Sequence, residues 1–191
     1  MRDVLALERT TEILPDDPYI AAYPHLVYFF ASKAAFGPAD VACGAHMVYG
    51  WMPTVLELYP DPDGTDLVTA ATLLTRAKSV GGLDRSEVES LAALVNNSLV
   101  GASKLLHFVA LASFAIWDSR VYSFVHQERP HNYRVNNVEK YFVYLERLGT
   151  LTRSPEFKRF HASVAAKLGY SVSPLRALEL IMFLNAPVYM G

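Results

Sequence analysis

Two short segments contain the side chains whose types and spacing allow chemistry, and the first is the boundary at Asp118. This residue lies between an apolar run, which ends at Trp117, and an amphipathic run that begins at Ser119. A carboxylate at such a boundary can cap the following helix, because its oxygens accept hydrogen bonds from free backbone amides. In a cleft, the same carboxylate can stabilise a positive charge or orient a water molecule. Asp118 is therefore both a candidate helix cap and a candidate catalytic residue.

The second segment, residues 101–108, precedes Asp118 and contains Gly101, Ser103 and Lys104. A glycine turn that leads into a helix can hold a phosphate, because the free amides of a helix N-terminus point toward an anion. Lys104 adds a positive charge near that end, fourteen residues before Asp118. The segment therefore predicts a phosphate-binding turn and helix, with Gly101, Ser103 and Lys104 as its contacts.

Together these segments resemble the helix-hairpin-helix DNA glycosylase superfamily over about residues 85–125. The sequence WDSRV at 117–121 matches that family's pattern of an apolar residue, an aspartate, a small polar residue, a basic residue and an aliphatic residue. With the blocks 49–53 and 103–108, it is most similar to the divergent branch associated with hypermodified bases of phage DNA. The resemblance implies a hairpin that grips the DNA backbone, helped by Arg120, and an aspartate, Asp118, that drives loss of a flipped-out base.

The function that this resemblance implies is antiviral. We expect a DNA glycosylase that excises a bulky modified pyrimidine, such as glucosylated hydroxymethylcytosine, from double-stranded phage DNA and leaves an abasic site. One alternative is a transferase that modifies the exocyclic methylene of a hypermodified thymine. Another is a non-catalytic DNA-binding module, which would need the hairpin but not Asp118.

The spacing of Lys104 decides which glycosylase chemistry we expect. Lyase members of the superfamily use a lysine in this helix to attack the sugar and form a Schiff base. Here the fourteen residues between Lys104 and Asp118 are fewer than the lyases usually show, and the hairpin has one glycine, Gly101, in place of two. The comparison implies a monofunctional enzyme in which water is the nucleophile and Lys104 contacts a phosphate.

A flipped base also needs a pocket, and aromatic faces stack well on extruded bases. The block at 49–53 is the best candidate wall, since a glycine and a proline there interrupt a regular helix. A cluster of aromatic residues at a helix junction is equally a feature of a hydrophobic core, and His107 is typical of a buried histidine bonded to backbone. The candidate pocket residues are Tyr49, Trp51, Met52, His107, Trp117 and Arg134.

The charge of the chain is unevenly distributed. The net charge is −2, which does not favour a protein that coats DNA without specificity. Residues 1–66 hold 3 Lys/Arg and 10 Asp/Glu, a net −7, whereas residues 101–191 hold 11 and 6, a net +5. The positive half therefore coincides with the segments that surround Asp118, and a local basic face can bind phosphates even on an acidic protein.

Composition excludes several classes of protein. The single cysteine, Cys43, excludes an intramolecular disulfide and a four-cysteine metal cluster. The six histidines show no HExxH or HxxxH spacing, so we expect no metal and no cofactor. We find no secretory leader and no apolar run long enough to span a bilayer. These features predict a cytoplasmic monomer that does not bind membranes.

The elements that must position these residues are all helical. A D-x-x-E start at Asp84 predicts a helix to about Val95, a turn to Gly101, and a second helix to about Leu111. Asp118 begins the next helix, and a polar loop follows at 128–134. We expect one all-α domain with two helical lobes around a cleft, its parts being an N-terminal helical lobe (1–82), the hairpin with the Asp118 helix (83–125), and the C-terminal helices (126–191). The other predicted helices span 26–35, 38–48, 53–59, 65–78, 138–148, 154–168 and 174–185.

Overall fold

The computed structural model describes residues 3–52 and 54–189, and over these residues the protein is all-α, as the sequence predicts. The described residues form eleven α-helices, a short 3₁₀ helix and no strand beyond one isolated bridge. The elements are α1 (Val4–Leu7), η1 (Glu8–Thr10), α2 (Pro18–Ala31), α3 (Pro38–Trp51), α4 (Leu67–Val80), α5 (Arg85–Leu94), α6 (Leu99–Val109), α7 (Ser119–His126), α8 (Asn132–Val135), α9 (Val138–Leu151), α10 (Phe157–Leu168) and α11 (Pro174–Leu184).

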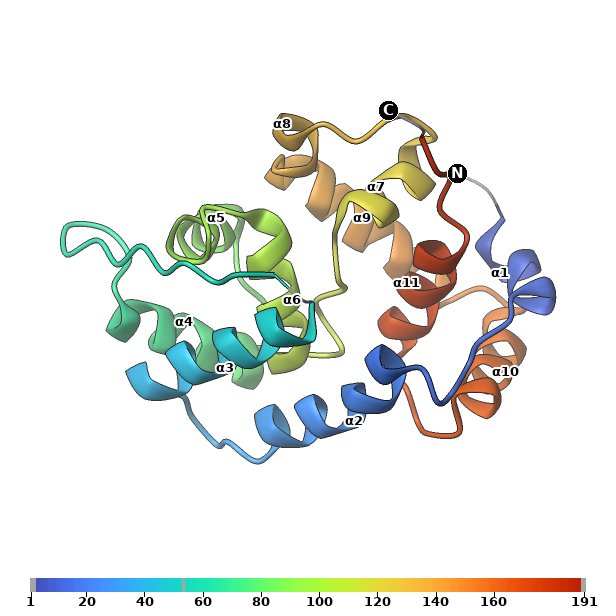
Figure 1. The fold of residues 1–191 in the computed structure, drawn as a ribbon, viewed down its shortest axis with the longest axis horizontal. Coiled ribbons are helices and arrows are strands. Elements are labelled where there is room, and N and C mark those ends of the chain that lie inside the picture. Colours follow the sequence, from blue (N-terminus) through green and yellow to red (C-terminus); the bar gives the residue numbers. More distant parts are fainter. Residues whose placement is uncertain (1–2, 53, 190–191) are drawn as a thin grey trace.

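The helices gather around α6. Figure 1 shows α3, α4 and α5 on one side of the molecule, α7, α9, α10 and α11 on the other, and α2 along the base of both groups. α6 packs against α2, α3, α4 and α5. All of its residues from 101 to 109 are buried. The position of every side chain in this stretch, Lys104 included, is therefore set by packing.

Helix starts follow the capping residues that the sequence contains. Asp84 accepts a hydrogen bond from Glu87 N–H, and the Glu87 carboxylate accepts one from Asp84 N–H, which is the predicted capping box. Asp118 caps α7, as predicted. Asp17 caps α2 with Pro18 in its first turn, so that helix begins well before the predicted residue 26. Residues 54–59 form no helix, and Pro53 lies outside the described residues.

The turn between α5 and α6 differs from the predicted glycine turn. Asn96 and Asn97 adopt positive φ values of 55° and 45°, and Ser98 caps α6. Asparagine tolerates this left-handed conformation because its side chain can bond nearby backbone. The Asn96 side chain bonds the backbone of residues 55 and 57. Two asparagines thus make the turn, in place of the expected glycine.

Gly101 has a different role, inside the first turn of α6. A Cβ atom there would lie 2.9 Å from Tyr49 Cζ and 3.0 Å from Val95 Cγ1, closer than packed atoms normally approach. Its N–H points to the Ser98 hydroxyl at 3.4 Å and is not left free for a ligand. Gly101 therefore allows α3 to lie against α6, and the expectation that it sits in a phosphate-binding turn is wrong.

We expect Gly101→Ala to lower the free energy of unfolding by about 1–3 kcal/mol, because the added methyl overpacks the contact with Tyr49. Urea unfolding at fixed pH measures this change. The matched control is Gly50→Ala in α3, where a Cβ would meet nothing within 4 Å and should stabilise the helix by up to about 1 kcal/mol. Equal effects at the two positions would contradict the assigned role of Gly101.

Candidate functional site

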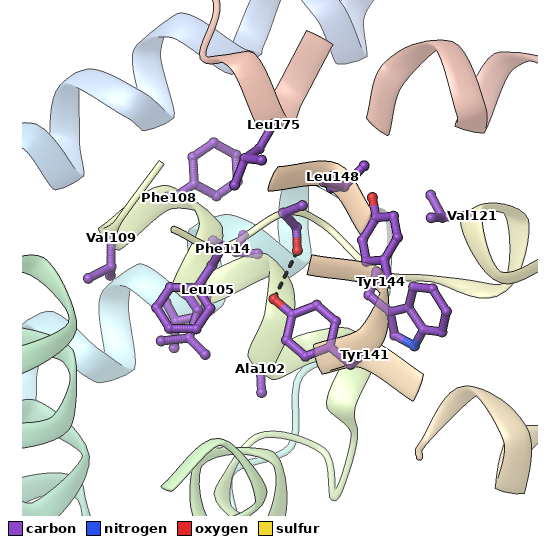
Figure 2. Packing of buried hydrophobic residues seen from close by; sticks show 14 of the residues in the cluster. Ala102, Leu105, Phe108, Val109, Phe114, Val121, Tyr141, Tyr144, Leu148 and Leu175 are labelled. Atoms are coloured by element: carbon purple, nitrogen blue, oxygen red, sulfur yellow. Dashed lines mark hydrogen bonds between the residues drawn. The ribbon is translucent and has the colours of Figure 1, made fainter. Parts of the chain in front are cut away.

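An extended segment, residues 114–117, places Asp118 between α6 and α9. Its backbone is buried and lies outside any helix, so its polar groups need side-chain partners. The Tyr141 hydroxyl donates to Ala115 C=O at 3.0 Å, and the Tyr144 hydroxyl donates to Ile116 C=O at 3.3 Å. Figure 2 shows both tyrosines among the buried apolar side chains, with the Tyr141 bond dashed. These bonds fix the segment that ends at Asp118.

Two further bonds complete the support of this segment. The Ser103 hydroxyl, on α6, accepts from Trp117 N–H at 3.1 Å and donates to Val100 C=O at 2.9 Å. The Trp117 indole N–H donates to Val135 C=O at 2.8 Å. Ser103 and Trp117 are both fully buried. They hold the site in place and are not exposed to a ligand, which differs from their expected roles in binding DNA and lining the base pocket.

The two oxygens of Asp118 have different surroundings. Oδ1 accepts from Arg120 N–H at 3.0 Å and from Val121 N–H at 2.9 Å, which caps α7. Oδ2 lies 3.7 Å from Lys104 Nζ. The residue as a whole is only 8% exposed. The capping and catalytic interpretations are therefore compatible, because the cap uses one oxygen and leaves the other beside a cation.

Lys104 is buried, with 8% of its surface exposed, and is not an outward-facing phosphate contact. Burial lowers the pKa of Lys104, and the charges of Asp118 and Glu179 oppose part of that shift. Lys104 also lines a cavity of about 270 Å³. The rest of the lining is mostly polar and contains no carboxylate, and it comprises Tyr49, Met52, Thr54, Asn96, Asn97, Ser98, Val100, Asn132 and Asn136.

A second buried ion pair, between Arg176 and Glu179 of α11, lies close to this one. Both residues are at most 1% exposed, and Arg176 Nη1 bonds Glu179 Oε2. The guanidinium carbon of Arg176 lies 4.8 Å from the ring centre of Tyr23, 5.4 Å from that of Tyr19 and 5.7 Å from that of Trp51. Aromatic faces thus surround a cation that water does not reach.

Trp51 belongs to a stack of half-buried rings. It lies parallel to Tyr19 with ring centres 4.0 Å apart, and Tyr19 lies parallel to Phe183 at 6.0 Å. The Arg120 guanidinium covers Phe183 at 4.2 Å. The stack therefore runs from α3 through α2 and α11 to a residue two positions after Asp118. Burial is the main cause of the raised pKa of Tyr19, and the charge of Asp118 adds to the rise.

The three remaining candidates for the base pocket, His107, Arg134 and Tyr49, have different surroundings. His107 is fully buried, with Nε2 2.8 Å from the Tyr23 hydroxyl and Nδ1 2.8 Å from Phe114 C=O. Burial lowers the pKa of His107 to about 3, so it is neutral and structural at ordinary pH. Arg134 pairs with Glu128 on the surface at 2.8 Å. Tyr49 is buried against Gly101 of α6.

A basic surface adjoins the start of α7. Arg120 and Arg129 are exposed and line a cavity of about 470 Å³ together with Ser119, Ser123 and Pro130. Arginine side chains in such a setting suit phosphate groups, which they bind through several donors. The positively charged half of the sequence therefore places two cations beside the helix that Asp118 caps.

Sequence reasoning missed Tyr19, Phe183, Arg176 and Glu179. The spacing of Arg176 and Glu179 allows an i,i+3 pair, but that spacing is equally common on exposed helix faces. Only the three-dimensional packing shows that this pair is buried. Tyr19, Trp51 and Phe183 lie far apart in the chain, and no local pattern links them.

Three further findings, on metal sites, membrane spans and similar proteins, are negative. The described residues hold no group of three or more histidine, cysteine, aspartate or glutamate side chains that could bind a metal ion. None of the helices over 3–52 and 54–189 has the length and apolar character that crossing a membrane requires. No family model, no curated protein and no solved structure matches the chain.

Proposed function

We propose that this protein is a monofunctional DNA glycosylase that flips a bulky modified pyrimidine out of double-stranded DNA and excises it. The observation that carries the proposal is Asp118 Oδ2, a buried carboxylate oxygen outside the cap of α7 and close to the stack of Tyr19, Trp51 and Phe183. A base needs a flat apolar surface, and its departing sugar needs a negative charge nearby. This site offers both.

In the proposed reaction the glycosidic bond breaks and its electron pair leaves with the base. The sugar carbon becomes positively charged, and the Asp118 carboxylate stabilises that charge. A water molecule, oriented by the same carboxylate, then adds to the carbon, and the proton that it loses neutralises the departed base. The products are a free base and an abasic site in an intact strand. The cap bonds from Arg120 and Val121 hold Asp118 in position without using Oδ2.

DNA binding is proposed to use the turn between α5 and α6 together with the basic surface at Arg120 and Arg129. The helix–turn–helix at residues 85–109 is the proposed hairpin, with Asn96 and Asn97 at its tip in place of glycines. Two lobes are proposed, one built on α3, α4 and α5 and the other on α7, α9, α10 and α11 (Figure 1), and the protein is proposed to act as a monomer.

Selectivity for a bulky modified base is proposed to depend on the polar groups of the base pocket. A site whose polar groups are satisfied only by an added substituent rejects an ordinary base, because those groups would stay unpaired. The proposed substrates are therefore modified pyrimidines of phage DNA, such as glucosylated hydroxymethylcytosine, and the proposed role is antiviral defence.

One observation favours a transferase as the second candidate. The cavity of about 270 Å³ beside Lys104 could hold a second substrate, since asparagine, serine and threonine side chains in its wall offer hydrogen bonds. A transferase would attach that substrate to the exocyclic methylene of a modified thymine and leave the glycosidic bond intact.

We expect Asp118→Asn to lower the rate of base release on the order of a hundredfold or more, because the charge opposite the cationic sugar is lost. The asparagine oxygen still accepts the cap bonds, so the fold should survive. Mass spectrometry of bases released from modified phage DNA measures the rate. The control is Asp66→Asn, which changes the equivalent cap of α4 and should leave the rate unchanged.

Undiminished base release by folded Asp118→Asn would contradict the proposed mechanism. Loss of release with unchanged DNA binding would separate catalysis from binding and exclude the non-catalytic module.

We expect borohydride to trap no covalent protein–DNA adduct during the reaction. A Schiff base requires a neutral, mobile amine, whereas the Lys104 ammonium is enclosed and lies beside the Asp118 carboxylate. Denaturing electrophoresis should show an intact strand that alkali cleaves. A known lyase on its own substrate confirms that trapping works, and an adduct that disappears in Lys104→Met would instead establish a lyase.

A further inference from the structure

Glu179 has an oxygen without a partner in the interior of the protein. The residue is 0% exposed, and Oε2 bonds Arg176. Oε1 has no hydrogen-bond partner, although it is buried. An unsatisfied oxygen on a buried carboxylate is costly and rare in native proteins, so it calls for a functional explanation. A buried carboxyl group can remove this cost by taking up a proton, at the loss of its negative charge.

Charged and titratable groups approach Glu179 from several helices. α7 and α9 pack on α11 and bring Asp118 and Tyr144, while Lys104 lies on α6. α1 and α10 also pack on α11. Lys167 of α10 pairs with Glu8, which follows α1 in η1, at 2.7 Å. The groups that act on Glu179 or feel its charge are Arg176, Asp118, Lys104, Tyr19, Tyr23 and Tyr144.

The net charge of this cluster depends on Glu179. Burial raises the pKa values of Tyr19, Tyr23 and Tyr144, so the tyrosines are neutral. Two cations then face two carboxylates, and the sum is zero when Glu179 is ionised. Protonation of Oε1 makes the sum +1. A positive cluster would oppose the cationic sugar that Asp118 must stabilise.

We propose that Glu179 is a positioning residue for Asp118. Glu179 must carry its negative charge for excision, and it takes up a proton at Oε1 as the pH falls. Ionised Glu179 neutralises Arg176 and helps to keep Lys104 protonated, so that the cluster as a whole, Asp118 included, is neutral. This role rests on the proposed function, because it assigns Glu179 to that same site. The titration of Glu179 itself can be measured whether or not the protein acts on DNA.

The direction of the titration follows from the surroundings. Burial raises the pKa of Glu179 to about 7, the charge of Arg176 opposes that rise, and the charge of Asp118 adds to it. Because the folded-state pKa is raised, the contribution of Glu179 to stability is present at low pH and is lost as the pH rises through about 7. A purely structural ion pair would behave oppositely, since acidification would break it. Activity should therefore rise with pH while this contribution to stability falls.

Carbon-13 NMR of the intact protein, labelled at the glutamate side-chain carboxyls, tests the titration. We expect one resonance to titrate near neutral pH, to be absent from Glu179→Gln, and to titrate at lower pH in Asp118→Asn. Glu156→Gln, an exposed control, should leave that resonance in place. If Glu179→Gln fails to fold, the shift in Asp118→Asn identifies the resonance. A Glu179 resonance that stays ionised down to pH 5 would overturn the proposal.

The activity of Glu179→Gln tests the link to Asp118. Glutamine still accepts a bond from Arg176 but leaves the cluster one unit more positive than it is with ionised Glu179. We expect base release at pH 8 to fall about tenfold or more, and the increase in wild-type activity between pH 6 and 8 to disappear. Wild-type rates and pH profile in folded Glu179→Gln would overturn the proposal. No base release by the wild type would refute the proposed function instead, and the NMR titration would still decide the ionisation of Glu179.

Discussion

The geometry of the site depends on hydrogen bonds that hold an extended, buried piece of backbone. Residues 115–117 lie outside any helix, and Ser103 on α6 and Tyr141 and Tyr144 on α9 bond their backbone groups. Losing one partner would leave a buried polar group unsatisfied, at a cost of about 1–3 kcal/mol. Because these bonds come from α6 and from α9, they fix where the segment ends. They therefore fix where Asp118 caps the start of α7. The position of the candidate catalytic carboxylate is a consequence of this support.

The next constraint is electrostatic. Burying four ionisable groups is unfavourable unless opposite charges are close, and the protein places Lys104 beside Asp118 and Arg176 beside Glu179. The aromatic faces of Tyr19, Tyr23 and Trp51 surround the Arg176 guanidinium and exclude water. In such a setting each charge acts strongly on the others, which suits a reaction that develops a positive charge. The same surroundings make the ionisation of one member matter to the rest.

Short-range signals in the sequence predict much of the fold. The caps at Asp84 and Asp118 are set by side chains within three residues, and the structure confirms both. The turn before α6 lies within the predicted residues, but Asn96 and Asn97 adopt the conformation expected of glycine, while Gly101 serves a contact with distant Tyr49. The burial of Lys104 could not be predicted for a similar reason. Nothing local shows that α6 is enclosed by four other helices or that α11 brings a second ion pair to the site.

The proposed activity of the site is cleavage of a glycosidic bond to a bulky modified pyrimidine. It is tested most directly by incubating the protein with duplexes of one sequence that carry ordinary cytosine, hydroxymethylcytosine, glucosylated hydroxymethylcytosine or a hypermodified thymine. Released bases are identified by mass spectrometry, and abasic sites are counted. The account requires release of a bulky modified base from an intact strand and no comparable release of ordinary bases. Equal release of ordinary bases, no release at all, or a mass gain on the base without abasic sites would contradict it.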